Sequence, residues 1–205
     1  MCPFCYLGCR QLHGALDHFE HADAVVVRHH AFELDPHSPL TYPGTLNELL
    51  AANYGLTVER SKEINAQVQA HAEELGLRWS LDTVQPANSF DAHRLVALAA
   101  SQNLQEKMLE RLFRAYFSEG SLISDFSILS SLALQVGVLG ADQMLQGDEF
   151  AEIVRHDKNL AARMGIQAVP AIILDGRVNV SGAQGVNSML DTLSTVWAGR
   201  QKLSV

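Results

Sequence analysis

The spacing of hydrophobic and polar positions changes along this 205-residue chain, and each change predicts a different element. Near the N-terminus, Leu7, Leu12 and Leu16 recur on one side of a helix within residues 2–16, although Gly8 weakens it. The continuous apolar run Val25–Val27 then predicts a buried β-strand within residues 23–34. A proline-rich segment ends this strand and predicts a loop that reaches residue 44.

Helical spacing dominates the middle of the chain. Thr45 and Glu48 form a capping box, and Gly55 would end the helix that they begin. Ser89 and Asp125 stand where two further helices need an N-cap. The other helices in this region are expected over residues 58–75, 90–103, 105–119, 126–136 and 150–164.

The pattern returns to short apolar runs after residue 165. Two such runs flank Asp175-Gly176, a dipeptide that favours a β-hairpin turn, and a final helix is expected over residues 186–197. Sheet elements at both ends with helices between them indicate a discontinuous domain. We therefore expect residues 1–44 and 165–205 to form one α/β domain and residues 45–164 to form a helical insertion.

Composition and charge narrow the classes of partner. The chain is 47% hydrophobic and carries a formal net charge of −8, so we expect neither nucleic acid nor an anionic membrane as a partner. No apolar run approaches the roughly 20 residues of a membrane span, and no signal-peptide pattern is present. The expected location is cytoplasmic, and the apolar faces of the central helices would allow a homodimer.

Two of the three cysteines, Cys2 and Cys5, form a C-x-x-C pair at the start of the first predicted helix. A helix N-terminus favours a thiolate, because its free N–H groups and the positive end of the helix dipole face the sulfur. Pro3 suits the first helical turn. We assign Cys2 as the attacking thiol and Cys5 as the resolving thiol, and we expect Cys2 to be accessible and Cys5 largely buried.

The cysteines are also compatible with roles other than thiol exchange between Cys2 and Cys5. The pair could be two small buried residues without chemistry, and Cys9 could be a buried hydrophobe or an auxiliary thiol that exchanges with Cys5. Cys2, Cys5, Cys9 and His13 could also ligate zinc. One straight helix cannot wrap four ligands tetrahedrally around an ion, so we expect no metal site and no cofactor.

Three motifs together resemble the thioredoxin superfamily, and within it the FrnE-like branch of DsbA-like proteins. They are "CPFC" at the start, "GIQAVPAIILDGR" with its Val169-Pro170 dipeptide, and "VSGAQ" after the predicted hairpin. The segments "HHAFELDP", "ANSFDAHRLVALA" and "LFRAYFSEG" extend the resemblance over nearly the whole chain. The resemblance implies a thioredoxin-like fold with a large helical insertion, and a protein disulfide oxidoreductase that acts on protein or small-molecule thiols and disulfides.

The resemblance also implies a site, carried over by matching position. Cys2 and Cys5 would be the catalytic pair, and Val169 and Pro170 would bind substrate. We add Phe4, which lies between the cysteines, as a further substrate-binding candidate. Val169-Pro170 at the entry to a strand is by itself compatible with either a trans or a cis peptide bond. With the C-x-x-C pair present, we expect a cis bond that faces the two cysteines.

Histidines supply few further candidates. His93, within "ANSFDAHRL", could line the cleft as an auxiliary residue. His29 and His30 are neighbours on a predicted strand, so their side chains face opposite sides and cannot form one chelating pair.

The position of the cysteine pair raises a structural expectation. In the fold that the resemblance implies, the C-x-x-C directly follows a central β-strand, and Met1 stands where that strand would already have ended. We therefore expect the first β-strand to be missing from this sequence, with other residues or a partner strand in its place. Unpaired strand neighbours would cost about 1–3 kcal/mol for each buried backbone group.

Two other functions share the predicted architecture. Kappa-class glutathione transferases and 2-hydroxychromene-2-carboxylate isomerases are similar in the insertion, but a serine stands where this chain has Cys2. A non-catalytic peptide-binding module would use the Pro170 loop without turnover. Two cysteines favour thiol–disulfide exchange over glutathione-dependent isomerisation, and the peptide-binding module stays an open alternative.

Overall fold

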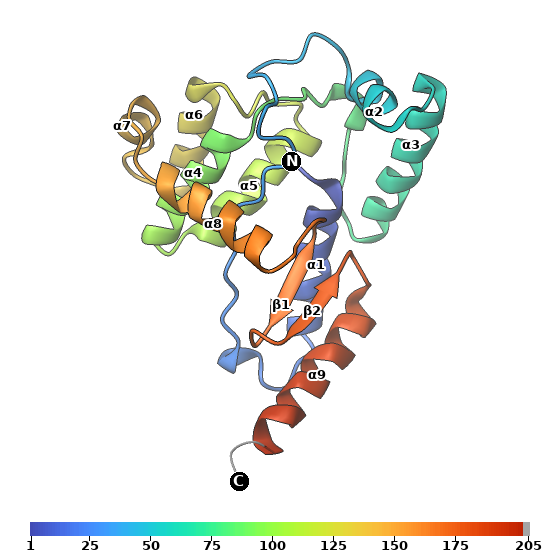
Figure 1. Cartoon of the computed structure of the whole chain (residues 1–205), viewed down its shortest axis with the longest axis vertical. Helices are drawn as coiled ribbons and strands as arrows, with labels where there is room; N and C mark the ends of the chain where they lie inside the picture. Colours follow the sequence, from blue (N-terminus) through green and yellow to red (C-terminus); the bar gives the residue numbers. More distant parts are fainter. Residues whose placement is uncertain (203–205) are drawn as a thin grey trace. The chain divides into compact units, whose positions relative to one another are not determined.

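A computed structural model of the chain describes residues 1–202, which divide into two compact units (Figure 1). The helical unit comprises residues 29–160 together with Met1. The hairpin unit comprises residues 2–28 and 161–202. That residues 45–164 form an insertion into a discontinuous domain stays a prediction. Among residues 1–202, no helix has the length and apolar character that a membrane crossing requires.

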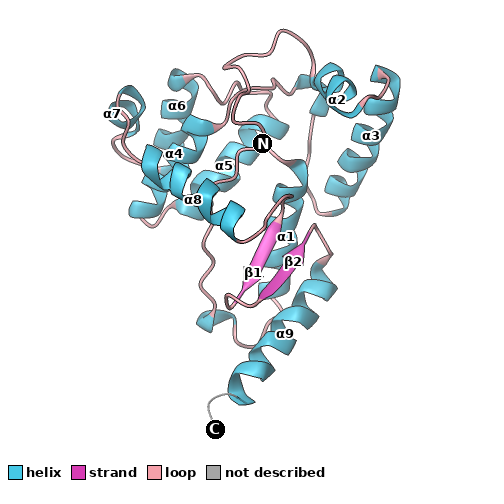
Figure 2. Cartoon of the chain, in the orientation of Figure 1, coloured by secondary structure: helices cyan, strands magenta, loops and turns pink. Residues whose placement is uncertain are grey.

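Helices account for most of the described chain, and one pair of strands forms its sheet (Figure 2). In chain order the elements are α1 (Pro3–Leu16), η1 (Ala22–Ala24), α2 (Leu46–Tyr54), α3 (Val58–Glu74), η2 (Leu81–Thr83), α4 (Phe90–Ser101), α5 (Gln105–Phe117), α6 (Phe126–Val136), α7 (Ala141–Gln146), α8 (Ala151–Arg163), β1 (Ala171–Leu174), β2 (Val178–Ser181) and α9 (Val186–Lys202).

The core of the helical unit forms where α4, α5 and α6 pack together. Their inward positions carry large apolar side chains that solvent does not reach, including Leu95, Met108, Leu112, Phe117 and Leu129. The Trp79 ring stacks on Phe117 with their centroids 5.0 Å apart. This burial fixes the faces that α4 and α5 turn inward, and it leaves their opposite faces available to polar side chains.

Local sequence signals set most helix ends. The capping box of Thr45 and Glu48 is present, and Asp125 accepts hydrogen bonds from two backbone N–H groups at the start of α6. Ser89 is the N-cap residue of α4, as expected, but its side chain makes no capping bond, and the Asn88 side chain accepts the Phe90 N–H instead. Helix α7 was not predicted, since its six residues are too few to show a helical period.

The predicted hairpin is confirmed and forms an antiparallel pair. Ile172 faces Val180 across it, and Leu174 faces Val178. Asp175 and Gly176 both take positive φ values, 55° and 66°, as a two-residue type I′ turn requires.

The hairpin, α1 and α9 share one apolar core. Leu12 and Ala15 of α1 meet Met189 and Leu193 of α9 in this cluster, together with Phe19. Partly buried side chains of both strands pack against it, which seats the hairpin on the two helices.

The strand expected within residues 23–34 is not formed, so that prediction is wrong. Residues 23 and 24 belong to η1, and Val25 after them is extended (φ −97°, ψ 128°). From Val25 to His30 the residues alternate between half-buried and exposed, but they pair with no strand among the described residues. Side chains satisfy part of their backbone instead. The Gln105 amide accepts the His29 N–H at 3.2 Å and donates to the His29 carbonyl oxygen at 2.9 Å, which imitates a ladder pair. Asp157 accepts the Ala31 N–H at 2.8 Å.

His29 and His30 face different helices, as the extended backbone predicts. His29 Nε2 lies 3.9 Å from a carboxylate oxygen of Glu106 in α5, whereas His30 Nδ1 lies 2.8 Å from one of Asp157 in α8. The two imidazoles therefore do not form one site.

The Gln105 amide gives a test of how this segment is held. Gln105→Ala removes both partners of the half-buried His29 backbone, and we expect it to destabilise the chain by about 1–3 kcal/mol. Gln102→Ala is the matched control, because Gln102 makes the same pair of bonds with the backbone of the exposed Leu139, where water can replace it. Denaturant unfolding measures both changes, and equal losses would contradict this account of residues 29–32.

Candidate active site

Cys2 and Cys5 lie at the N-terminal end of α1. Cys2 is the N-cap with an extended backbone (φ −105°, ψ 122°), Pro3 follows in the first turn, and the Cys5 N–H donates to the Cys2 carbonyl oxygen at 3.2 Å. Tyr6 and Leu7 are buried and hold the next turn of the helix against the protein. The two thiols thus occupy a helix end whose orientation is set by burial immediately beyond it.

All three cysteines are free thiols and half-buried, so the structure shows no clear contrast in burial between Cys2 and Cys5. Cys5 is still within the first turn of α1, and the open end of a helix does not bury that turn. Phe4, between the pair, is 47% exposed and presents an aromatic ring to solvent beside both sulfurs.

The two thiols have opposite pKa shifts. A hydrogen bond from the Cys5 thiol is the largest cause that lowers the pKa of Cys2 to about 7, and the backbone N–H groups of Cys5 and Phe4 add to it. The same hydrogen bond, followed by burial, raises the pKa of Cys5 above its usual range. At neutral pH the negative charge therefore belongs on Cys2, which is the thiol that the sequence assigns as the nucleophile.

The Val169–Pro170 turn lies beside Cys2. Its peptide bond is cis, as expected from the sequence, and the Cys2 thiol donates to the Val169 carbonyl oxygen with an Sγ–O distance of 3.7 Å. Pro170 is buried, and its carbonyl oxygen accepts the Gly182 N–H at 2.8 Å just beyond β2. Cys2, Cys5, Val169 and Pro170 are thus brought together within the hairpin unit.

Two residues that the sequence analysis did not assign to the site hold this arrangement. A Cβ atom placed on Gly8 would lie 3.1 Å from Pro170 Cγ, so only glycine lets the turn come this close to α1. The Gln11 side chain is buried and accepts the Gly185 N–H at 2.8 Å, which ties α1 to the segment before α9. A glycine inside a strongly helical segment was the available signal for the first of them.

The auxiliary candidate Cys9 belongs to the same helix as the pair. Cys9 follows Cys5 by one helical turn, and its charge helps to raise the pKa of Cys5. Within residues 1–202, no three His, Cys, Asp or Glu side chains gather closely enough to hold a metal ion.

His93 belongs to α4 of the helical unit. Burial lowers its pKa to about 4, while a hydrogen bond to the Phe32 backbone and the charge of Asp157 act in the opposite direction. Its imidazole is therefore neutral at neutral pH, and its named neighbours all belong to the helical unit.

Comparisons with known proteins show the family of this chain. The model of the family described as "DSBA-like thioredoxin domain" matches residues 1–194. The probable DsbA oxidoreductase SCO1869 from Streptomyces coelicolor is 32% identical with a TM-score of 0.91, over 96% of this chain and 86% of that one. The uncharacterized protein YwbO of Bacillus subtilis (strain 168) is 29% identical over 191 residues, 90% of this chain and 87% of that protein.

A more distant solved structure shares the fold alone. It is the cytosolic disulfide reductase DsbM from Pseudomonas aeruginosa, 20% identical with a TM-score of 0.63 over 97% of this chain and 95% of DsbM. DsbM has also been solved with GSH. The expected thioredoxin-like fold, mostly helical with a small sheet, is confirmed.

The contact between Gly8 and Pro170 can be tested by adding one methyl group. Gly8→Ala should leave stability nearly unchanged, because about 1 kcal/mol of gained helix propensity offsets the crowding of Pro170. We expect the rate of insulin disulfide reduction to fall several-fold, since Pro170 carries Val169 away from Cys2. Gly14→Ala is the control, as its Cβ would also meet a neighbour, Val186, at 3.1 Å, but far along α1. An equal fall in rate in both variants would contradict the claim that Gly8 holds the Val169–Pro170 turn beside Cys2.

Proposed function

Because the chain belongs to the family of DSBA-like thioredoxin domains, we propose that it is a thiol–disulfide oxidoreductase in which Cys2 attacks and Cys5 resolves. One observation carries the assignment. The thiol whose pKa is lowered to about 7 is the one that lies 3.7 Å from the Val169 carbonyl oxygen, beside the Pro170 turn. A nucleophile and a segment of backbone that can align a peptide thus meet at one point.

The proposed reaction moves two electrons between a dithiol and a disulfide. The Cys2 thiolate attacks one sulfur of a substrate disulfide, which forms a mixed disulfide and releases the other substrate sulfur as a thiolate. The Cys5 thiol then loses its proton and attacks the Cys2 sulfur, which closes the Cys2–Cys5 disulfide and releases the second substrate thiol. The substrate is reduced and the protein is oxidised, and the reverse sequence oxidises substrate thiols.

The raised pKa of Cys5 assists the order of these steps. While Cys2 is ionised, the Cys5 thiol donates a hydrogen bond to it and stays protonated, so it does not compete as a nucleophile. Once Cys2 enters a mixed disulfide, its negative charge is gone and Cys5 is released from that hydrogen bond. The loss of the Cys2 charge therefore favours ionisation of Cys5 at the step that needs it.

Val169, Pro170 and Phe4 form the proposed substrate surface. Val169 lies at the sulfur, the buried Pro170 fixes the turn against α1, and Phe4 offers an exposed ring to an apolar side chain of the substrate. Protein disulfides and small-molecule disulfides are both in reach of such an open site. Cys9 and His93 are proposed only as auxiliary residues.

The proposal extends to the branch and the location. The "CPFC" and "VSGAQ" motifs favour the FrnE-like branch, with residues 45–164 as the insertion of a discontinuous domain. Three free cysteines suit the reducing cytoplasm, where the pair would spend much of its time as a dithiol and act by reduction or isomerisation.

Insulin reduction, with glutathione as the electron donor, tests the function. We expect the protein to accelerate the reaction and Cys2→Ser to abolish the acceleration. Cys9→Ser is the matched control, because it removes a thiol from the same helix and leaves the C-x-x-C pair intact. An unaccelerated reaction combined with saturable glutathione binding would favour a glutathione-dependent transferase, and the absence of both would favour a peptide-binding module.

Phe4 gives a prediction about redox poise. The Cys2 thiolate should be lost as the pH falls through about 7, and titration of its absorbance measures that midpoint. Phe4→His places a cation next to the pair, so the midpoint should move to lower pH. A more stable thiolate stabilises the reduced form, so the reduction potential against glutathione should rise. Phe4→Leu is the control and should change neither the Cys2 midpoint nor the reduction potential. If Phe4→His leaves both at their original values, the prediction is wrong.

A further inference from the structure

A cavity lies on the helical unit, where α5 and the end of α6 meet. It has a volume of about 580 Å³, within the range of small-molecule sites. We call it the α5–α6 pocket, and its lining comprises Lys107, Glu110, Arg111, Arg114, Gln135 and Val136.

Cations dominate one face of α5 at this pocket. Lys107, Arg111 and Arg114 are spaced by four and then three residues, so they share one side of the helix. The chain as a whole carries a formal net charge of −8. The wall of this cavity is therefore locally rich in cations, although the chain as a whole is acidic.

Arg111 is the buried member of the group, since its side chain is only 9% exposed. Its Nε donates to Gln135 at 2.7 Å, and its Nη2 donates to Glu119 at 2.8 Å. Among the residues that the structure describes, nothing accepts a hydrogen bond from its Nη1. A guanidinium edge without an acceptor needs one, because a buried polar group is almost always satisfied.

The carboxylates at the pocket do not cancel its cations. Glu119 is shared, because its two oxygens accept from Arg111 and from Arg114, the latter at 3.1 Å. Glu110 also lines the pocket. Three cations thus face two carboxylates, and the remaining positive charge can be matched by one further anion.

We propose that the α5–α6 pocket binds the oxyanion of a small molecule, a carboxylate or a phosphate, through Arg111 with Lys107 and Arg114. Arginine suits this ligand, since a charged N–H donor such as the Nη1 of Arg111 makes a strong hydrogen bond with an oxygen of either group. No aromatic ring lines the pocket, so the anionic group itself must supply the recognition. The site is separate from the Cys2–Cys5 pair in sequence and chemistry.

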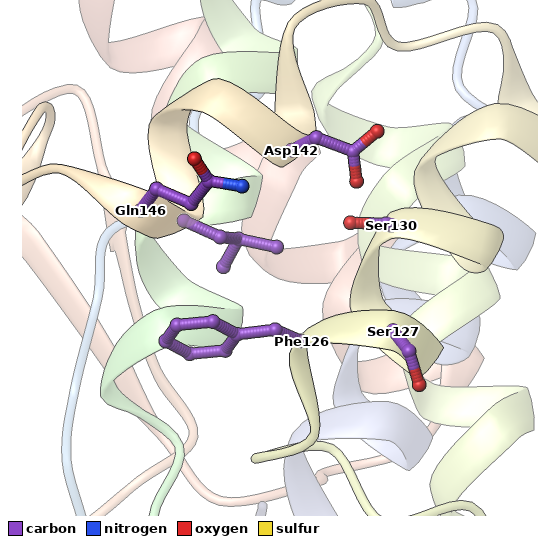
Figure 3. A pocket seen from close by; sticks show the side chains of 6 residues that line it. Phe126, Ser127, Ser130, Asp142 and Gln146 are labelled. Atoms are coloured by element: carbon purple, nitrogen blue, oxygen red, sulfur yellow. The ribbon is translucent and has the colours of Figure 1, made fainter.

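A hollow between α6 and α7 differs from the α5–α6 pocket in the charge of its lining residues. It is smaller, about 120 Å³, and Asp142 is the only charged residue among those that line it. Figure 3 shows Asp142 facing Ser130, with the Phe126 ring and Gln146 along the wall. A carboxylate without a cation repels an anion, so this hollow supplies no competing oxyanion site.

Calorimetric titration of the full chain at low ionic strength tests the proposal, with inorganic phosphate and citrate as separate probes. We expect saturable binding of at least one probe, and the arm that binds identifies the phosphate or the carboxylate as the preferred group. Arg111→Gln should weaken binding by roughly tenfold or more, as expected for loss of a charged hydrogen bond. Arg111→Lys should restore part of it.

Two further variants keep the test independent of the fold. Lys107→Gln and Arg114→Gln change exposed side chains, so both should fold and each should weaken binding several-fold. Arg60→Gln removes an exposed arginine from α3 and should leave binding unchanged. None of these variants should alter insulin reduction. Absence of saturable binding by both probes would overturn the proposal, as would equal weakening by Arg60→Gln.

Discussion

The close approach of α1 to the Val169–Pro170 turn is the constraint on which the candidate site depends. Gly8 has no side chain at the point of contact, so Pro170 lies directly against the helix. The chain continues from Pro170 into β1, and the hairpin packs with α1 and α9 around one apolar core. Burial in that core therefore sets the distance between the Val169 carbonyl oxygen and the Cys2 sulfur.

The same helix supplies the electrostatics of the site. Its N-terminal N–H groups and the Cys5 thiol stabilise a negative charge on Cys2, and they do so without any basic side chain between the cysteines. Phe4 occupies that place and remains exposed. The helix end thus provides the reactivity, while the residue between the thiols is available to contact substrate.

Much of this could be predicted from the sequence, because local signals determine it. The capping box at Thr45 and the turn at Asp175-Gly176 are short-range features, and the C-x-x-C and Val-Pro motifs together indicated which segments meet. The predictions that failed depend on distant partners. Residues 25–30 have the alternation of a strand but no ladder partner in the described part of the chain, and the relative burial of Cys2 and Cys5 depends on how their helix end is covered. The pairing of Gln105 with the His29 backbone carries no signal in the sequence.

Capture of the mixed disulfide tests the central claim most directly. In a Cys5→Ser variant, the intermediate with a disulfide substrate cannot be resolved by the pair, so it should accumulate. Peptide mapping by mass spectrometry would locate the substrate sulfur. This account predicts that it is bound to Cys2, and a substrate bound to Cys9, or no captured substrate at all, would contradict it.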